Sequence, residues 1–174
     1  DEYFMARPYL DAIELSQNDD TKSLAEAYAK RQVDGLSQVD PSSVKDLEQQ
    51  GALELERYRM PSYVGAYFNT SRSSLSDPAV RRSMTQAIDR PSLVREVLQN
   101  EGNVAQYPIP AQYSGFNSQA LRLPFDLGVA KQALQGKFTG RLKLVTVNSG
   151  AYPEVAKRLV QAWGEAGVNV DILA

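Results

Sequence analysis

The hydrophobic and polar positions of this chain predict strands and helices in turn. Alternation with a period of two predicts strands over 9–17, where Leu10, Ala12 and Leu15 point inward, and over 52–60. An aromatic-rich run predicts a further strand over 62–70. Short apolar runs predict strands at 33–37, 141–147 and 168–173. The strand regions are therefore spread over the whole chain.

Apolar residues spaced for one helix face predict the helices between these strands. They fall at 19–32, 40–51, 77–90, 91–102, 126–136 and 152–167. In the third helix, Ser76 or Asp77 is the expected cap and Val80, Met84, Ala87 and Ile88 form the buried stripe. Asp89 is expected to cap the fourth helix after the break at Pro91, and Gly102 to close it.

The order of these elements predicts an α/β fold with α+β character, in which helices flank a mixed sheet. The last strand, helix and strand form a β-α-β unit, which places two strands parallel through a right-handed crossover. The stretches 52–60 and 62–70 are the expected antiparallel pair. A chain of 174 residues with this order is expected to form a single domain over 1–174.

Composition narrows the range of chemistry. The chain has no histidine and no cysteine, which excludes Ser-His-Asp and Cys-His catalysis, disulfides and Cys/His zinc sites within it. The net charge is −2 and the basic residues are scattered, so nothing predicts a nucleic-acid partner. No membrane span or signal peptide is recognised. The first residue is Asp1, from which a processed or excised piece is expected.

Two stretches carry a resemblance to a known family. "RPYLDAIELSQNDDTKSLAEAYAKRQVDGLSQV" and "YFNTSRSSLSDPAVRRSMTQAIDRPSLVREVLQNEGNVAQYPIPAQYSGFN" resemble extracytoplasmic solute-binding proteins of the peptide/nickel ABC transporter type. "DLGVAKQAL" and the final β-α-β unit follow in the family's order. The resemblance implies part of the C-terminal lobe of a type II periplasmic-binding-protein-like, two-lobed fold.

The resemblance also implies a function. Such proteins lie outside the cytoplasm, in the periplasm or as surface lipoproteins, and deliver peptides or other small solutes to a membrane ABC permease. It implies no enzyme activity and no cofactor. The family's usual acidic partner for a peptide amino group belongs to sequence that would follow Ala174.

The first candidate site is the loop between the strand 141–147 and the helix 152–167. Its expected ligand-contacting residues are Asn148, Ser149, Gly150 and Tyr152. Ligands of α/β sheets favour the carboxyl ends of strands, and free N–H groups at a helix start favour an anion such as a peptide carboxylate. No arginine lies between Thr146 and Tyr152, although dipeptide-binding family members use one there. A plain turn capped near Ser149 or Tyr152 is the equal alternative.

The other candidates are aromatic or polar loop residues. Tyr107 and Tyr113, in the proline-rich loop 103–125, offer rings for a peptide or aliphatic ligand, although packing within the loop explains them better. Asn69 ends a predicted strand, where a turn accounts for it. Asp19, Asp20 and Asp171 lack the spacing of a calcium loop, so no metal site is expected.

Two other functional classes stay open at this point. A cytoplasmic transcriptional regulator with a solute-binding-like sensor domain would have a DNA-binding segment before Asp1. A small hydrolase would need a pair of carboxylates acting as acid and base, and no such pair brackets a cleft in the sequence.

Overall fold

The computed structural model describes residues 9–17, 21–37, 39, 43–44, 47–48, 56, 58, 62–109, 113, 116–117, 119–120 and 122–173. Its larger elements are, in chain order, α1 (Thr21–Ala29), α3 (Ser73–Ser76), α4 (Pro78–Gln86), α5 (Arg90–Glu96), α6 (Leu127–Leu134), β1 (Leu142–Val145), α7 (Tyr152–Glu165) and β2 (Val170–Leu173).

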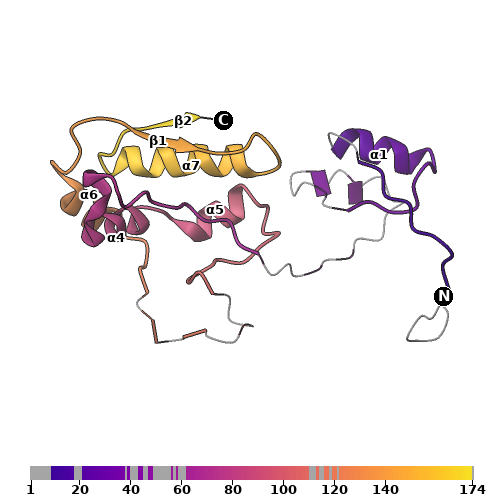
Figure 1. The fold of residues 1–174 in the computed structure, drawn as a ribbon, viewed down its shortest axis with the longest axis horizontal. Helices are drawn as coiled ribbons and strands as arrows, with labels where there is room; N and C mark the ends of the chain where they lie inside the picture. The colour runs from indigo at the N-terminus through magenta and orange to yellow at the C-terminus, as the bar shows by residue number, and fades with distance from the viewer. Residues whose placement is uncertain are drawn as a thin grey trace.

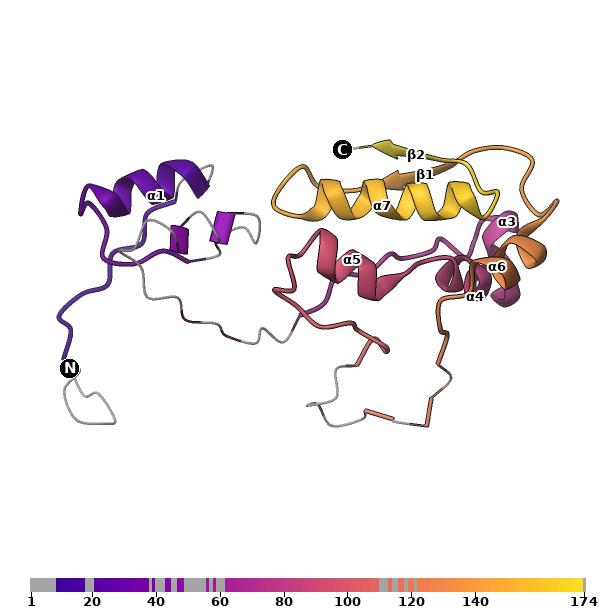
Figure 2. The same cartoon turned by 180° about the vertical axis from the view of Figure 1, so that it is seen from behind.

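The elements from α3 to β2 form one layered body (Figure 1). The strands β1 and β2 lie on one side of α7, and α4, α5 and α6 lie on its other side, as the view from behind also shows (Figure 2). The helix α1 lies apart from this body in both views. The long helix α7 is therefore the central layer.

The predicted β-α-β unit is confirmed. β1 and β2 pair in parallel, with Leu142 opposite Val170 and Val145 opposite Leu173. Pro153 lies in the first turn of α7, where its missing N–H costs no helical hydrogen bond. After the helix, Gly167 has a φ of +88°, a conformation that glycine adopts without the Cβ penalty of other residues. Both ends of the helix thus form as the sequence indicates.

The predicted caps and stripe of α4 are confirmed as well. The Asp77 side chain accepts a hydrogen bond from the backbone N–H of Ala79, and Pro78 begins the helix. Val80, Met84 and Ala87 are buried, with Met84 only 1% exposed. The apolar face of α4 therefore forms part of the core.

The helix α5 begins as predicted but ends differently. Asp89 accepts hydrogen bonds from the backbone N–H and the hydroxyl of Ser92, which caps the helix. The expectation that Gly102 closes the helix is wrong, because the chain already reverses at Gln99 and Asn100, with φ of 50° and 65°. Asparagine tolerates this left-handed conformation better than most side chains.

The core gathers around Trp163 of α7. Its buried members come from α3, α4, α6, α7, β2 and the residues that directly follow α4 and α7: Leu75, Val80, Met84, Ala87, Ala130, Leu134, Trp163, Ala166, Val168 and Val170. Phe68 packs against this cluster, with its ring 6.1 Å from the ring of Trp163. The apolar face expected for the helix over 152–167 is confirmed, since Val155, Trp163 and Ala166 are buried and Leu159 is partly buried against the same cluster.

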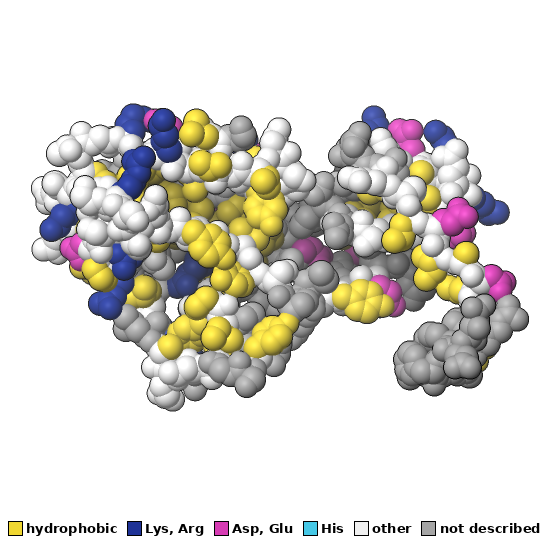
Figure 3. Space-filling view, viewed as in Figure 1, with side chains coloured by type: hydrophobic (Ala, Val, Ile, Leu, Met, Phe, Trp, Pro, Cys, Tyr) yellow, Lys and Arg dark blue, Asp and Glu magenta, His cyan; other side chains and the backbone are white. Residues whose placement is uncertain are grey.

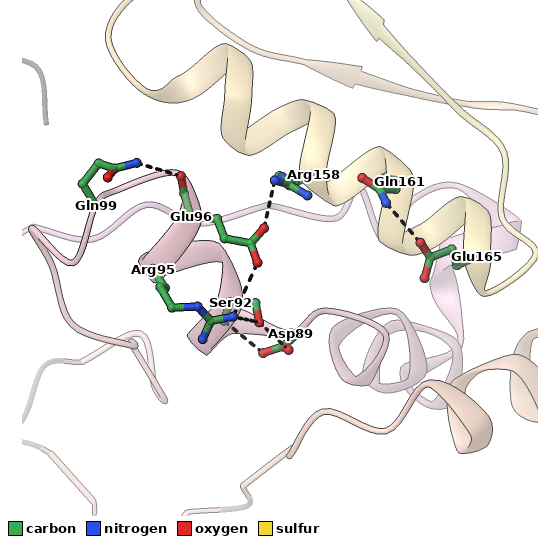
Figure 4. Close-up of polar contacts among 8 residues, drawn as sticks. All are labelled: Asp89, Ser92, Arg95, Glu96, Gln99, Arg158, Gln161 and Glu165. Carbon is green, nitrogen blue, oxygen red and sulfur yellow. Dashed lines mark hydrogen bonds and ion pairs between the residues drawn. The ribbon is translucent and has the colours of Figure 1, made fainter. Parts of the chain in front are cut away.

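Charged side chains join α5 to α7 at the surface. Glu96 pairs with Arg158 of α7 at 2.8 Å and with its neighbour Arg95 at 3.4 Å (Figure 4). Arg95 also donates to the hydroxyl of Ser92. A chain of polar contacts thus runs from the cap of α5 to the flank of α7.

The strands predicted in the first part of the chain are wrong where the structure describes them. Residues 9–17, 33–37 and 62–69 form no strand. Leu10 and Leu15, expected to face inward, are 66% and 94% exposed. Alternation produces a strand only where another strand pairs with its backbone, and among the described residues only β1 and β2 pair. The described sheet is consequently parallel, without the antiparallel pair expected over 52–70.

Other predictions fall partly outside the described residues. The helix expected at 19–32 forms as α1, with Leu24, Ala25 and Tyr28 half-buried. The side chains that could cap it, those of Asp20 or Thr21, lie outside the description. Residues 43–44 and 47–48 are helical, as expected within 40–51, and the rest of that range lies outside the description. The same holds for 52–60 apart from residues 56 and 58.

Candidate functional site

The loop after β1 lies at the carboxyl ends of both parallel strands. Thr146 extends the pairing by donating its N–H to the Leu173 carbonyl at 2.9 Å. Asn148, Ser149 and Gly150 follow, and all three are exposed. Gly150 has a φ of +53°, which turns the chain toward α7. The structure therefore brings the first group of predicted residues together in the loop at the carboxyl-terminal end of the sheet (Figure 1).

The start of α7 has few free donors. Ala151 is the N-cap and supplies no capping side chain. The Tyr152 N–H donates to the Ser149 carbonyl at 3.3 Å, Pro153 has no N–H, and the Val155 N–H donates to the Ala151 carbonyl at 3.0 Å. This leaves the N–H of Glu154 as the first-turn amide without a partner among the described residues. Because Glu154 itself places a carboxylate in the first turn, the site is less favourable for an anion than expected.

Apolar side chains surround this loop. Val145, Val147 and Tyr152 are 75%, 58% and 46% exposed, and Leu173 beside Val145 is 45% exposed. Hydrophobic side chains also reach the surface elsewhere on the face drawn in Figure 3, whereas Lys and Arg gather toward the end of the body away from α1. The loop thus offers apolar contact area with a few backbone polar groups, as ligand sites commonly do.

Tyr107 is used within its own loop. Its hydroxyl donates to the Ala120 carbonyl at 3.0 Å and accepts from Nε of Arg122 at 3.3 Å. Its ring meets Phe116 edge to face at 5.6 Å between centroids. The packing interpretation of Tyr107 is therefore supported, while Tyr113 remains 42% exposed.

Asn69 forms a turn. Its side chain accepts from the Ser71 N–H at 3.1 Å and its carbonyl from the Arg72 N–H at 3.2 Å, directly before α3. Arg72 lines a shallow depression with Arg141 and Leu142, at the end of the body where β1 begins. This is the opposite end of β1 from Asn148, so the structure does not bring Asn69 to the loop before α7.

The three predicted groups consequently do not form one site. The described residues of the loop 103–125 lie on the side of α4 and α5 away from the sheet, as Figures 1 and 2 both show. The residues before α7 lie at the carboxyl-terminal end of the sheet. A single ligand meets both groups only if it spans the body or if another part of the protein completes each surface.

An exposed tyrosine pair was not anticipated. Tyr63 and Tyr67 are 40% and 85% exposed, and their hydroxyls lie 3.3 Å apart. The hydrogen bond to Tyr67 raises the pKa of Tyr63 above its ordinary value. Between them, a side chain on Gly65 would lie 3.0 Å from the Tyr63 ring. The sequence signal for this pair is the spacing of the two tyrosines, which the prediction of a strand over 62–70 already explained.

The carboxylate of Asp171 has a structural partner. Asp171 accepts a bidentate pair of hydrogen bonds from Arg141, which holds the pKa of Asp171 below its usual value. No three described His, Cys, Asp or Glu side chains gather as metal ligands would, and Asp19 and Asp20 lie outside the description. No described helix has the length and apolar character to cross a bilayer.

The comparisons with known proteins extend these observations. All of residues 1–174 match the family model described as "Bacterial extracellular solute-binding proteins, family 5 Middle". The chain belongs to this family. The family resemblance of the sequence is thereby confirmed.

Curated relatives of this family 5 chain are named as peptide-binding proteins. A probable di/tripeptide-binding protein of Pseudomonas aeruginosa is 25% identical over 98% of this chain and 34% of its own length. The dipeptide-binding protein of Escherichia coli is 23% identical over 99% of this chain and 34% of its own. The oligopeptide-binding protein AppA of Bacillus subtilis is 32% identical over 62% of this chain and 20% of its own. The family 5 chain thus spans about a third or less of the length of these relatives.

Solved structures confirm the fold. The substrate-binding protein CtaP of Listeria monocytogenes superposes with a TM-score of 0.78, at 21% identity, over 90% of this chain and 33% of that one. AppA of Bacillus subtilis, solved with a nonapeptide, superposes with a TM-score of 0.72, at 21% identity, over 88% and 34%. The α/β family 5 chain therefore has the fold of part of a type II periplasmic binding protein.

Proposed function

We propose that this chain is a single domain over 1–174, part of the C-terminal lobe of an extracytoplasmic receptor. The receptor delivers peptides, or similar small solutes, to a membrane ABC permease. The observation that carries the proposal is the match of the whole chain to a family of extracellular solute-binding proteins. The names of the relatives supply the ligand class, since several are peptide-binding proteins.

The loop before α7 supports this role for the lobe. Asn148, Ser149 and Gly150 are exposed at the carboxyl ends of the strands, beside the exposed ring of Tyr152. Peptide ligands need apolar contact for side chains and backbone groups for amides, and this loop offers both. Because Glu154 places a carboxylate in the first turn of α7, the loop contacts the peptide backbone rather than capturing its carboxylate.

The receptor acts by binding and does not transform its ligand. Asp77 and Asp89 serve as helix caps and Asp171 pairs with arginine, and relatives are named for what they bind. The family description names extracellular proteins, which favours import over the cytoplasmic regulator.

Isothermal titration calorimetry on the full-length receptor containing this chain tests the proposal. We expect saturable binding of dialanine, trialanine or a mixed-sequence nonapeptide. Because a lobe supplies only part of the contacts yet bears the same entropy cost of association, the 174-residue chain alone should bind at least about tenfold more weakly.

Asn148→Ala and Tyr152→Ala should weaken binding by the full receptor. The matched control is Gln132→Ala, an exposed change on α6. Binding that is equal for all three variants removes this loop from the site. A full receptor that binds none of the three peptides removes peptides as the ligand class.

A further inference from the structure

Arg90 joins the two ends of a long loop. It is the first residue of α5, and its guanidinium donates from Nη1 to the Ala105 carbonyl at 3.2 Å and from Nη2 to the Leu123 carbonyl at 2.5 Å. These acceptors lie at the two ends of the described residues 105–109, 113, 116–117, 119–120 and 122–123, here called the clasped loop. A guanidinium holds its donors in one rigid plane, so it bridges two acceptors whose spacing it then fixes.

A second closure lies within the clasped loop. Tyr107, near its beginning, donates its hydroxyl to the Ala120 carbonyl near its end. Arg122 donates Nε to the same hydroxyl, and Phe116 packs against the tyrosine ring. The described residues of the loop form no helix or strand, so these side-chain contacts replace a backbone ladder.

The position of Arg90 is itself fixed by the helices. The cap at Asp89 and the ring of Pro91 set the start of α5 on either side of it. Just beyond the loop, the Asp126 N–H donates to the Gln86 carbonyl at the end of α4 at 2.9 Å. The clasped loop is therefore tied to the α4–α5 junction by the Arg90 side chain and, just beyond its end, by this backbone hydrogen bond.

We propose that Arg90 is the positioning residue of the clasped loop, which it holds as a preformed surface for the ligand of the receptor. Arg90 does not contact the ligand. It lowers the conformational entropy that the loop, with its exposed Tyr113, would lose on binding. This inference rests on the proposed function, to which it adds the clasped loop as a second ligand-contacting surface.

Hydrogen exchange tests the clasp without any ligand. The reporters are the amides of Phe116 and Ala120, which donate to the carbonyls of Tyr113 and Asn117 at 3.2 Å each. In Arg90→Gln we expect these amides to exchange about tenfold faster, since two hydrogen bonds of typical net strength are lost. In Arg90→Lys these amides should exchange nearly as fast as in Arg90→Gln, because an ammonium cannot bridge both carbonyls in one plane.

The matched control is Arg95→Gln, which removes an arginine from the same helix that bonds Ser92 and Glu96 and not the loop. Its loop amides should exchange at the wild-type rate. Unchanged exchange in Arg90→Gln overturns the proposal. If Arg90→Gln fails to fold, Arg90→Lys takes its place, because it keeps the charge but cannot bridge both carbonyls, and unchanged exchange of the loop amides there overturns the proposal equally.

Calorimetry with trialanine on the full receptor tests the link to ligand binding. We expect Arg90→Gln to weaken binding about tenfold, with a less favourable entropy, and trialanine to protect the loop amides more in this variant than in wild type. Equal affinity and equal protection in Arg90→Gln and wild type overturn the ligand half of the inference. A wild-type receptor that binds no peptide rules out the proposed function. The exchange rates still decide whether Arg90 holds the loop.

Discussion

The indole N–H of Trp163, in α7, donates a hydrogen bond of 2.9 Å to the backbone carbonyl of Met84, in α4, and both residues are buried. Met84 lies in the last turn of its helix, where carbonyls lose their helical partners. The Ile88 N–H, which would continue the helix, donates instead to the Thr85 carbonyl at 3.3 Å. The tryptophan thus satisfies a buried acceptor at the helix end and also fills the core.

Trp163→Phe should separate these two roles. Phenylalanine keeps most of the apolar contact but leaves the Met84 carbonyl buried without a donor, which costs about 1–3 kcal/mol of unfolding free energy. Urea denaturation followed by circular dichroism measures the loss. The control is Tyr152→Phe, which removes a hydroxyl from a residue that is 46% exposed. Equal unfolding midpoints for the two variants would show that the hydrogen bond from Trp163 to Met84 does not contribute to stability.

Met84→Ala should be among the most destabilising truncations in α4. The side chain is 1% exposed, so its removal leaves a cavity and costs roughly 2–5 kcal/mol. Arg82→Ala, on the exposed face of the same helix, should change the unfolding free energy by about 0.5 kcal/mol or less. Thermal unfolding of both variants checks the difference, and similar melting temperatures would contradict the assigned orientation of α4.

Acid should remove part of the stability of this chain through Asp89. Hydrogen bonds from the hydroxyl and then the N–H of Ser92 lower the folded-state pKa of Asp89. A depressed pKa means that the folded state holds the ionised form more tightly, so its stabilisation is present above the unfolded pKa of about 3.9 and is lost as the pH falls through the folded value. Urea titrations between about pH 5 and pH 2 should show this loss.

Asp89→Asn should flatten that acid dependence while keeping a capping side chain. Ser92→Ala, which removes the first of the two donors, should leave an intermediate slope. Hydrogen bonds from Arg141 also lower the pKa of Asp171, so Asp171 should likewise lose stabilisation as the pH falls. This contribution remains in both variants. An acid slope that survives unchanged in Asp89→Asn would exclude Asp89 as its source.

The sequence was most informative where helices form on local signals. Three kinds of signal can be read within one or two helical turns: the caps at Asp77 and Asp89, the prolines in the first turns of α4, α5 and α7, and the apolar face that includes Trp163. The β-α-β unit was likewise predictable because its three elements follow directly in the chain. The family assignment followed from the order of such local motifs.

Strands and sites depend on distant partners, and there the sequence was less informative. Residues 9–17 and 62–69 alternate or are aromatic, but no described strand pairs with them. The contacts of Arg90 with Ala105 and Leu123 carry no sequence pattern, because backbone carbonyls are present at every residue. The separation of Asn69, Tyr107 and Asn148 likewise follows from topology, which residue types alone do not reveal.

The ion pair between Glu96 and Arg158 should contribute modestly to the packing of α5 on α7 (Figure 4). Their side chains are 41% and 45% exposed, so solvent screens the 2.8 Å pair. A double-mutant cycle with Glu96→Gln and Arg158→Gln should give a coupling of about 0.2–1 kcal/mol that falls with added salt. A coupling that does not change between low and high salt would argue against an ionic origin.

Gly150→Ala should strain the loop before α7 and so report on the candidate site. Gly150 has a φ of +53°, and a Cβ in this left-handed region costs about 1–2 kcal/mol. Gly140→Ala is the control, because its added methyl meets nothing within 4 Å and its φ lies outside the left-handed region. Chemical denaturation should show the cost for Gly150→Ala alone.

In the full receptor, the same variant should also weaken peptide binding in calorimetry, since relief of the strain moves Asn148 and Ser149. A destabilised receptor with unchanged peptide affinity would leave Gly150 as a turn residue and exclude its loop from the binding surface.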